Sequence, residues 1–542
     1  MKLEREADVV VAGGGLAGLV TAFELLDHGL SVLVLDRDEP AKLGGLAKRS
    51  FGGVMFVDTP HQRKLGLQDS PELAWADWQS FADFGPDDEW PRTWARTYVE
   101  RSREMIFDWL TARGVEFLPV VNWAERGLFR PGNSVPRWHI AWGTGWAIVE
   151  AVVAGLEAHP RRDRLEIRFG HRVERLLVED GRVVGCAGVR EDDGGDFEIR
   201  APHLVLASGG ICGGDLSRVR RHWYEPWGEA PAHLLNGSHR FADGLLHDAA
   251  AAHGANLTHL DLQWHYAAGV RQKDGDAPEE GISLVPPRSA LWLDAHGRRF
   301  GPLPLMGYTD TRHLVERICR SPGQYSWQVL NWKIAIKELA VSGCDYMTAF
   351  RYKRKLEVVK QVLLGNPGLV ERLIDECEGF VVADSLPELM ERMDALSLDE
   401  HRIDREGMAA DIAAYDGMID RGPRYFNDDQ LRRIAGARTY KGDRLRTCRF
   451  QKIDDPKARP LIAIRELILS RKSLGGIQTD LSSRVLRASG EPIPGLYAVG
   501  ETAGFGGGGI HGKGSLEGTF LGSCVLTGRL AGRAIAVAEG RG

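Results

Sequence analysis

The sequence of 542 residues predicts an α/β protein in which both ends of the chain build one domain and the middle forms an inserted α+β domain. Three observations predict this class. A strand, a glycine turn and a helix follow one another in "EADVVVAGGGLAGLVTAFELLDHGL" at the N-terminus. The same order returns near the C-terminus, where "GLYAVG" leads through a glycine-rich loop into an apolar helix. Between them the sequence changes to charged helices such as "SLPELMERMDAL", so we expect domain segments 1–270, 271–449 and 450–542.

The N-terminal motif is a glycine fingerprint between two expected strands. Residues 9–11 suit a buried parallel strand, residues 13–18 read GxGxxG, and a helix is expected to about His28, before a second strand that ends at Asp36. In such a motif the glycines let backbone N–H groups at the helix N-terminus meet a pyrophosphate. The acid about twenty residues on accepts a hydrogen bond from a ribose hydroxyl. The pattern predicts a Rossmann-type dinucleotide site, and Asp36 disfavours a 2′-phosphate.

Composition excludes several classes of protein. The chain is 43% hydrophobic and 27% charged, as in ordinary globular proteins. A net charge of -6 and a pI near 6.3 lack the basic footprint of nucleic-acid binding. Seven cysteines are scattered singly, without a CxxC pair or metal spacing, which favours reduced thiols, a cytoplasmic location and no metal. We expect neither a signal peptide nor a membrane span.

Further glycine turns and strands lie between the two ends of the chain. "KLGGLAKRSFGGV" begins six residues after Asp36 and is expected to wrap the pyrophosphate from the other side. "RVERLLVEDGRVVGCAGV" alternates as a hairpin, and "APHLVLASGGICGG" is a strand that enters a glycine turn. The densest basic run, residues 351–360, mixes charged and apolar residues and is interpreted as a solvated helix face.

The stretch "GETAGFGGGGIHGKGSLEGTFLG", residues 500–522, has ten glycines in twenty-three positions. Glycine is used where a backbone turns sharply or approaches a ligand closely. A flexible linker is the alternative, but linkers are Gly/Ser-rich and lack the large apolar residues that flank this stretch. We therefore expect backbone that lies against a flat ring and supplies N–H groups to it.

An ordered series of motifs covers nearly the whole chain: "VVVAGGGLAG", "GGLAKRSFGG", "LVLASGG", "FADG" with "DLQWH", "LWLDAHGRRF", "TDTRHLVERI", "LGGIQTD" and "GLYAVGE" with its glycine loop. This series resembles the flavoprotein superfamily of fumarate reductases, succinate dehydrogenases, L-aspartate oxidase and 3-ketosteroid dehydrogenases. The end of the chain is most similar to the bacterial FAD-binding dehydrogenases near the ketosteroid enzymes. The resemblance implies a Rossmann-type, GR2-like FAD-binding domain with an inserted capping domain for the substrate.

The same resemblance implies where FAD is held. The fingerprint glycines and Asp36 hold the ADP half, and the second glycine cluster covers the pyrophosphate and the flavin edge. Glu501 lies near the ribityl or pyrophosphate region. A helix that starts between Glu517 and Leu521 points its N-terminus at the flavin O2. Some relatives attach FAD through a histidine where this chain has Leu46, so we expect non-covalent FAD. The implied contacts are Gly13, Gly15, Leu16, Ala17, Gly18, Asp36, Arg37, Gly44, Gly45, Leu46, Ser50, Gly52, Gly53, Val173, Ala207, Ser208, Gly209, Gly500, Glu501, Gly518, Thr519, Phe520 and Leu521.

Two departures from the family bear on the substrate. The dicarboxylate enzymes clamp a carboxylate with a histidine and an arginine, and this chain has Lys472 and Ser515 at those positions. Without the guanidinium fork, recognition of a planar carboxylate loses its main anchor, which disfavours fumarate, succinate and aspartate. His265 and Arg312 match a family histidine and the arginine that donates a proton in fumarate reductases. The alternatives are a core histidine and a helix-surface ion pair.

Other candidate catalytic groups are Lys472, His511 and Tyr440. A desolvated Lys472 is a candidate acid or base, or equally a contact to phosphate or to flavin N1/O2. His511 lies in the glycine loop, where the alternative is a structural hydrogen bond, and Tyr440 is either a proton relay or a core tyrosine. Nine of the fifteen tryptophans fall between residues 75 and 146, which suits a channel for a bulky apolar substrate or simply a core.

These observations together favour an FAD-dependent dehydrogenase that acts on a CH–CH bond next to a carbonyl, with a ketosteroid or a similar apolar ketone as the leading substrate. An alkene reductase with a separate electron donor is one alternative, and a non-catalytic flavin-binding redox protein is another. The expected partners are a small-molecule substrate and an electron acceptor or donor that the sequence does not identify.

Overall fold

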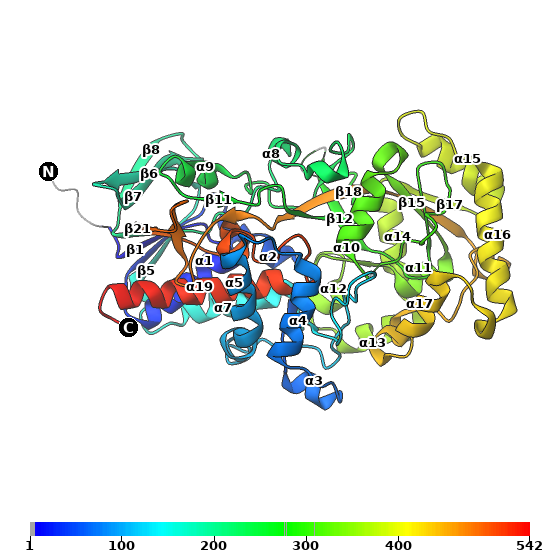
Figure 1. Ribbon diagram of the computed structural model, residues 1–542, viewed down its shortest axis with the longest axis horizontal. Coiled ribbons are helices and arrows are strands. Elements are labelled where there is room, and N and C mark those ends of the chain that lie inside the picture. The colour runs from blue at the N-terminus through cyan, green and yellow to red at the C-terminus, as the bar shows by residue number, and fades with distance from the viewer. Residues whose placement is uncertain (1–5, 276, 278, 308) are drawn as a thin grey trace. The chain divides into compact units, whose positions relative to one another are not determined.

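The computed structural model describes residues 6–542, apart from residues 276, 278 and 308. The chain divides into two compact units (Figure 1). Unit 1 contains residues 6–223, 238–264 and 472–542, and unit 2 contains residues 224–237 and 265–471. Both ends of the chain therefore belong to unit 1. The predicted limits 271–449 of the inserted domain stay a prediction.

Unit 1 is built on a six-stranded sheet with the strand order β20-β21-β9-β1-β2-β5. All neighbours are parallel except the pair of β20 and β21. Its central strands are fully buried and, apart from His203 in β9, apolar, as expected when both faces of a parallel sheet are covered. The strands are β1 (Val9–Ala12), β2 (Val32–Leu35), β5 (Leu165–Arg168), β9 (His203–Leu206), β20 (Arg484–Leu486) and β21 (Pro492–Ala498).

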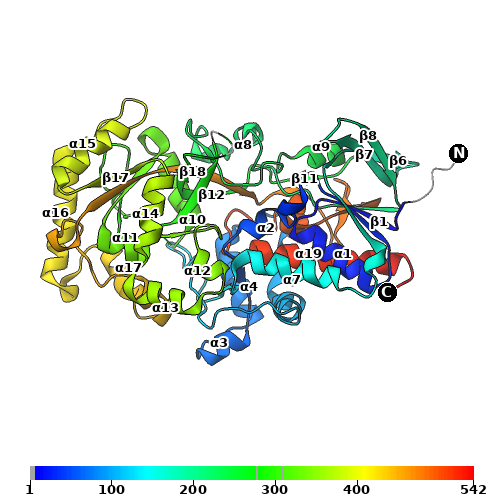
Figure 2. The same ribbon diagram turned by 180° about the vertical axis from the view of Figure 1, so that it is seen from behind.

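Helices from opposite ends of the chain pack together on one face of this sheet. In both views α1 (Leu16–Asp27) lies beside α19 (Thr519–Ala538), and α7 (Thr144–Glu157) lies next to them (Figures 1 and 2). The close approach depends on small residues, because a Cβ on Gly528 would lie 2.7 Å from the Ala17 oxygen. Glu24 of α1 also accepts hydrogen bonds from Arg529 Nε at 3.0 Å and Arg533 Nε at 2.5 Å. Tertiary packing thus joins segments about 500 residues apart.

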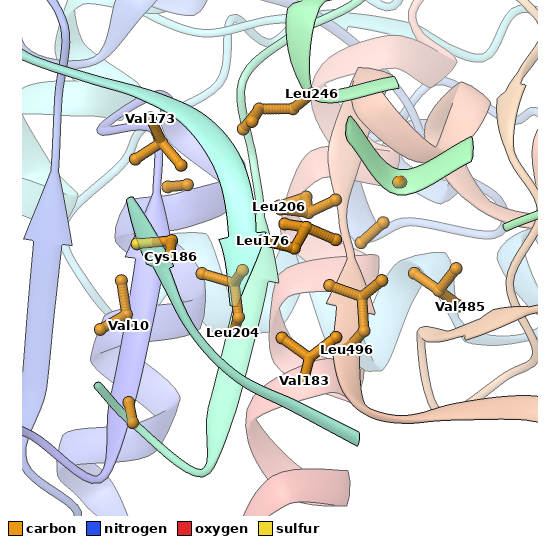
Figure 3. Close-up of a cluster of buried hydrophobic side chains, with 14 of the residues drawn as sticks. Val10, Val173, Leu176, Val183, Cys186, Leu204, Leu206, Leu246, Val485 and Leu496 are labelled. Carbon is orange, nitrogen blue, oxygen red and sulfur yellow. The ribbon is translucent and has the colours of Figure 1, made fainter. Parts of the chain in front are cut away.

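A second, antiparallel sheet covers the opposite face. It consists of β6 (His171–Glu179), β7 (Arg182–Arg190) and β8 (Asp196–Arg200), and β6 with β7 confirms the predicted hairpin. Figure 3 shows the apolar cluster between the layers. Its labelled side chains come from both sheets and from α9 (Leu245–Ala251): Val10, Val173, Leu176, Val183, Cys186, Leu204, Leu206, Leu246, Val485 and Leu496.

The other elements of unit 1 are short, and several surround the glycine segments. The strand pairs β3·β4 and β11·β19 are antiparallel. The elements are α2 (Gly45–Arg49), β3 (Gly53–Met55), α3 (Pro60–Lys64), α4 (Pro71–Ala82), α5 (Glu89–Arg101), α6 (Trp109–Thr111), β4 (Trp138–Ile140), α8 (Ser217–Arg221), β11 (Leu257–Thr258) and β19 (Gly476–Ile477).

Unit 2 is an α+β unit around a mixed sheet of eight strands within the described residues. The long strand β18 is central, since β15 and β17 both pair antiparallel with it and β10 pairs parallel with it. The strands are β10 (Leu235–Asn236), β12 (Gln263–Arg271), β13 (Gly281–Val285), β14 (Leu291–Leu293), β15 (Ser326–Asn331), β16 (Ala340–Val341), β17 (Phe380–Ala383) and β18 (Leu461–Ser473).

Helices make up most of the remainder of unit 2, as the charged sequence predicts. The stretch "SLPELMERMDAL" forms α15, whose N-cap Ser385 accepts from the Glu388 N–H. The helices are α10 (Thr311–Cys319), α11 (Trp332–Glu338), α12 (Thr348–Arg351), α13 (Lys355–Leu364), α14 (Pro367–Glu376), α15 (Leu386–Leu396), α16 (Arg405–Arg421), α17 (Asp429–Ala437) and α18 (Lys441–Arg446).

One helix in the described part of the chain, α19, is long and apolar enough to cross a membrane by length and composition alone. Two thirds of that apolar segment are buried inside the protein, at 67%. Its apolar character is therefore accounted for by packing against α1 and the glycine segments.

Candidate active site

The three fingerprint glycines are required for three different reasons. Gly13 has a positive φ of 122°, and a Cβ there would lie 2.3 Å from the Ala207 oxygen. A Cβ on Gly18 would lie 2.0 Å from the Gly13 oxygen, so this glycine lets α1 approach β1. Gly15 has an ordinary φ of -71° and would meet no protein atom within 4 Å. No protein atom requires a glycine at this N-cap, and the open space at the N-terminus of α1 suits an approaching ligand.

Asp36 is held against the glycine turn. Its Oδ2 accepts a hydrogen bond from the Gly14 N–H at 2.6 Å, and its Oδ1 accepts from the Asp38 N–H at 2.7 Å. Both bonds orient a half-buried carboxylate at the end of β2, directly beside the N-terminus of α1. This is the position from which an acid reaches the ribose of a nucleotide.

Arg37 lies in a charged cluster next to this acid. It donates to Glu191 at 2.5 Å and to Asp243 at 2.8 Å, and its guanidinium lies 4.1 Å from the centre of the Phe241 ring. These bonds engage its N–H groups within the protein. A role for Arg37 toward the cofactor therefore stays a prediction.

The second glycine segment lies directly against the first. The Gly44 N–H donates to the Gly14 oxygen at 2.9 Å, and Gly44 and Gly15 form an isolated parallel bridge. Gly44 has a φ of 101° and Gly45 one of 56°. Gly45 begins α2, which contains Leu46 and brings another helix N-terminus to Gly15.

Trp138 occupies the space beside two of the predicted flavin-edge glycines. A Cβ on Gly53 would lie 1.9 Å from Trp138 Nε1, and one on Gly518 would lie 2.5 Å from Trp138 Cδ1. The Gly518 oxygen also accepts from the Met55 N–H at 2.8 Å. Nearby, a Cβ on Gly52 would lie 2.4 Å from the Gly145 nitrogen. The N–H of Gly145 donates to the Ser50 oxygen at 3.1 Å. Contacts between distant segments thus position the first turn of α19.

A third group of predicted contacts surrounds Glu501. Its Oε1 accepts from the Ser473 N–H at 2.8 Å, and Ser473 Oγ accepts from the Ile211 N–H at 2.8 Å. The glycine turn after β9 is tied to the same place, because Thr502 Oγ1 donates to the Gly209 oxygen at 3.0 Å. The residues Ala207, Ser208, Gly209, Gly500 and Glu501 therefore lie together at the carboxyl ends of β9 and β21.

Gly500 has a second close contact, and the predicted contacts Leu16 and Val173 have different surroundings. A Cβ on Gly500 would lie 2.7 Å from Ala17 Cβ, so this glycine fits closely against the first turn of α1, which also contains Leu16. Val173 is buried in the apolar cluster of Figure 3. Its predicted role toward FAD stays a prediction.

The glycine loop itself is packed mainly against protein. Residues 504–509 all have positive φ, including the bulky Phe505 at 62°. A Cβ on Gly506 would lie 2.8 Å from the Trp94 ring, and one on Gly508 would lie 2.2 Å from Thr258 Oγ1. The sequence suggested that these glycines face a flat ring. Close protein contacts and backbone conformation already require them, and their contact with a flat ring stays a prediction.

Lys472 and His511 meet at the start of α19 around Phe520. Lys472 Nζ lies 3.7 Å from the centre of the Phe520 ring and 4.0 Å from Glu517 Oε1. The His511 ring lies 4.8 Å from the Phe520 ring and stacks on Trp78 at 5.6 Å, with an angle of 10° between the planes. The Lys472 side chain is only 13% exposed. A cation and an imidazole are thus held side by side in an aromatic environment.

The shorter hydrogen bonds around His511 favour one tautomer. Thr519 Oγ1 donates its single hydrogen to the Leu516 oxygen at 2.8 Å, so it accepts from His511 Nδ1 at 3.1 Å. Nε2 of the neutral ring then carries a lone pair, and this atom is buried without a partner among the described residues. Burial, and after it the charge of Lys472, lowers the His511 pKa to about 3. His511 is therefore a neutral hydrogen-bond acceptor at physiological pH.

The remaining catalytic candidates lie in unit 2. The guanidinium of Arg312, on α10, lies 4.4 Å from the centre of the Tyr224 ring and 4.6 Å from that of Trp227. Burial lowers the Arg312 pKa. Burial, and after it the charge of Arg312, lowers the pKa of His265 to about 3. Tyr440 is half-buried at the N-cap of α18. Thus His265 and Arg312 share one environment in unit 2.

Two further polar side chains of unit 1, His139 and Lys513, have partners within the protein. His139 is fully buried, donates from Nδ1 to the Arg137 oxygen at 2.7 Å and accepts at Nε2 from Thr59 Oγ1 at 2.8 Å. Lys513 forms an exposed ion pair with Asp83 at 3.1 Å. Among the described residues no group of three or more His, Cys, Asp or Glu side chains is arranged to hold a metal ion.

Comparison with known proteins decides the family. A family described as "FAD binding domain" matches residues 8–521. The chain belongs to this FAD-binding family. A KsdD-like steroid dehydrogenase of Mycobacterium tuberculosis (strain CDC 1551 / Oshkosh) is 45% identical, over 98% of this chain and 96% of its own. One of Mycolicibacterium smegmatis (strain ATCC 700084 / mc(2)155) is 44% identical, over 95% and 96%.

A solved structure shares the fold at low identity. The 3-ketosteroid delta1-dehydrogenase of Sterolibacterium denitrificans, in complex with 1,4-androstadiene-3,17-dione, has a TM-score of 0.71 and 16% identity. The match covers 98% of this chain and 99% of that one. The architecture predicted from the sequence, a Rossmann-type FAD-binding domain with an inserted α+β domain, is thereby confirmed.

The residues of this FAD-binding protein fit the cofactor. Gly15 leaves open space at a helix N-terminus, Asp36 is oriented beside it, and Gly518 starts a second helix that has no side-chain cap. Backbone N–H groups at such ends bind pyrophosphate and stabilise negative charge. FAD is the cofactor, and unit 1 carries the residues that match its parts.

Sequence reasoning missed several side chains of this site. Trp138 lies between Gly53 and Gly518, Trp78 stacks on His511, and Ser473 joins Glu501 to the turn after β9. Their only signal was position: Trp138 belongs to the tryptophan-rich segment, and Ser473 directly follows Lys472.

Proposed function

We propose that this protein is an FAD-dependent dehydrogenase that introduces a carbon–carbon double bond next to the carbonyl of a ketosteroid. The end-to-end 45% identity to a KsdD-like steroid dehydrogenase carries this proposal. The absence of a carboxylate clamp supports it, because Lys472 and Ser515 stand where dicarboxylate enzymes have a histidine and an arginine. FAD, held without a covalent bond, supplies the acceptor for the hydride.

Lys472 has the charge for stabilising an enolate. When a proton leaves the carbon beside a carbonyl, negative charge develops on the carbonyl oxygen. The ammonium group of Lys472 lies on the Phe520 ring with little exposure, where its interaction with a nearby anion is screened weakly. We assign Lys472 the role of binding that oxygen as the proton leaves.

His511 has the geometry for positioning the substrate. Its Nδ1–H is fixed by Thr519, which leaves the buried Nε2 to accept a hydrogen bond. Its low pKa keeps it neutral beside Lys472, so the two groups do not repel each other. We assign His511 the role of a neutral acceptor for a hydroxyl group of the substrate, since a ketone oxygen has no hydrogen to donate.

Arg312 and His265 are proposed to act from unit 2. An aromatic environment around the Arg312 guanidinium suits an apolar substrate, and His265 is kept neutral by burial and by that cation. Tyr440 is retained as a candidate proton relay. A cytoplasmic location and a separate electron acceptor complete the proposal.

Product analysis tests this function. The holoenzyme is incubated with an artificial electron acceptor and, in separate reactions, a saturated 3-ketosteroid, a 3-ketosteroid with one ring double bond, and succinate. We expect a product lighter by two hydrogens from a ketosteroid and no fumarate from succinate. Turnover of succinate alone would overturn the proposal. Reduction of a ring double bond only with a chemically reduced donor would instead indicate an alkene reductase.

Variants of Lys472 test the assigned site. We expect Lys472→Met to lower kcat with the ketosteroid by about 100-fold or more, as for removal of a preorganised electrostatic contact, while FAD stays bound. Lys457→Met, an exposed lysine in unit 2, is the matched control and should leave kcat unchanged. Equal activity of wild type and Lys472→Met would exclude this role for Lys472.

A further inference from the structure

Helix α13 in unit 2 presents apolar side chains to solvent. Leu356, Val359, Leu363 and Leu364 are 88%, 55%, 65% and 70% exposed, and no residue of this helix is buried. The spacing of 356, 359 and 363 places them on one side of the helix. Tyr352, 57% exposed, precedes them in the turn after α12. We call residues 352–364 the α13 surface.

This clustering is unusual within the described chain. Twelve large hydrophobic residues are strongly exposed in it, and five of them lie in these thirteen residues. The C-terminal end of α13 is anchored, since Lys337 Nζ donates to the Val362 oxygen at 2.6 Å and the N–H of Asn366, two residues after the helix, donates to the Ile336 oxygen at 2.7 Å. The apolar side chains are therefore held outward by a fixed helix. Both views place α13 at an edge of unit 2 (Figures 1 and 2).

Positive charge surrounds the apolar side chains. Residues 351–364 contain five basic side chains and one acidic one, a net charge of +4 in a chain whose net charge is -6. Arg351 pairs with Asp345 at 2.5 Å and Arg354 with Glu357 at 3.3 Å. Lys353, Lys355 and Lys360 are exposed, and no ion pair with an acidic side chain is found for them among the described residues. Lys360 lies on the same side as the leucines.

We infer that the α13 surface is a docking site for an anionic lipid bilayer. An interfacial helix inserts apolar side chains at the level of the headgroups while Lys and Arg contact anionic lipids. Tyrosine is favoured at the same level. The observed combination of outward leucines, a tyrosine and uncompensated lysines matches both requirements. The contact is peripheral and involves no membrane span, and it does not depend on the identity of the substrate.

A second copy of this chain is the main competing occupant. A dimer through the same surface would bring two copies of residues 352–364 together, each with four basic side chains and one acidic one, a net charge of +3, and like charges at an interface are unfavourable. An anionic bilayer offers the complementary charge. The charge therefore favours lipid over self-association.

Vesicle flotation of the purified holoenzyme tests this inference. We expect the protein to float with vesicles of phosphatidylcholine and phosphatidylglycerol, to float weakly with phosphatidylcholine alone, and to be released from the former by salt. Lys355→Glu with Lys360→Glu should weaken binding by at least about 25-fold, since each basic residue contributes about five-fold. Leu356→Ser with Leu363→Ser should weaken it by about 100-fold.

Matched variants and light scattering distinguish the outcomes. Lys64→Glu with Lys457→Glu makes the same charge change at exposed lysines elsewhere, and Val537→Ser removes an equally exposed apolar side chain. These controls should float like wild type, and all variants should keep their dehydrogenase activity on soluble substrate. The inference is overturned if wild type does not bind anionic vesicles or if the control variants lose binding equally. It is also overturned if wild type is a dimer that binds no vesicles and that Leu356→Ser with Leu363→Ser converts to a monomer.

Discussion

A pair of glycine substitutions separates the cofactor role of the fingerprint from its structural role. Gly15→Ala adds a methyl group where no protein atom lies within 4 Å and where φ is ordinary, so the fold itself can accept it. Gly18→Ala adds a methyl group 2.0 Å from the Gly13 oxygen, so α1 must move away from β1. We predict that Gly15→Ala loses FAD affinity at unchanged stability and that Gly18→Ala loses stability.

The magnitudes follow from the local geometry. Alanine in place of glycine at an N-cap lowers the free energy of unfolding by up to about 1 kcal/mol. Alanine also restricts the unfolded chain, which raises this free energy by about 0.4–1 kcal/mol. Without FAD, the free energy of unfolding of Gly15→Ala should therefore stay within about 1 kcal/mol of that of wild type. A methyl group on residue 15 would prevent about two backbone N–H groups at the start of α1 from donating hydrogen bonds to the charged pyrophosphate of FAD. At about 1.5–3 kcal/mol each, FAD affinity should fall about 10²- to 10⁴-fold. For Gly18→Ala, overpacking should cost about 1–3 kcal/mol or more.

Two assays on flavin-free protein check this prediction. Calorimetric titration with FAD gives Kd, and denaturant unfolding without FAD gives the free energy of unfolding. Gly417→Ala, in the middle of α16 with no atom within 4 Å of its Cβ position, is the matched control and should change neither quantity adversely. An unchanged FAD Kd for Gly15→Ala would refute the interpretation that a ligand requires this glycine.

Three further predictions concern charges and protons. His511→Phe should retain FAD but raise KM about ten-fold for a ketosteroid that carries a hydroxyl group, because it removes the acceptor for that hydroxyl. An unchanged KM would contradict the assigned acceptor role. Burial lowers the pKa of His139 to about 3, so as pH falls below 6.5 the unfolded chain binds a proton before the folded protein does. The free energy of unfolding should therefore decline from pH 6.5 towards pH 3. In His139→Gln the slope of this free energy with pH should be smaller by up to about 1.4 kcal/mol per pH unit. Arg137→Met leaves Asp69 and Asp77 buried without their partner, so denaturant unfolding should show a loss of about 3–5 kcal/mol, much of it regained when both acids are also replaced by asparagine.

The parts of the fold that local sequence determines were predictable. The β1 strand, the α1 helix and the β2 strand agree closely with the predicted strand, glycine turn, helix and strand, because apolar spacing and glycine positions act within about thirty residues. The same holds for the hairpin of β6 and β7. Charged helices in the middle of the chain were also recognisable, as α15 shows.

Contacts between distant segments were not predictable. Glu24 pairs with Arg529 and Arg533 from the other end of the chain, and no local pattern marks those partners. The position of Trp138 against Gly53 and Gly518 likewise needs three segments to meet. The sequence likewise does not show that Trp94 and Thr258 fill the space beside the glycine loop.

The most direct test of the central claim is an anaerobic titration of the purified, yellow holoenzyme with a ketosteroid, followed by the visible absorbance of the oxidised flavin. The account predicts that one equivalent of a saturated 3-ketosteroid bleaches this absorbance and yields an equal amount of steroid with one more double bond. It also predicts that Lys472→Met, with the same amount of bound FAD, bleaches at least about 100-fold more slowly. A protein that binds FAD and keeps its full absorbance with every ketosteroid would contradict the account.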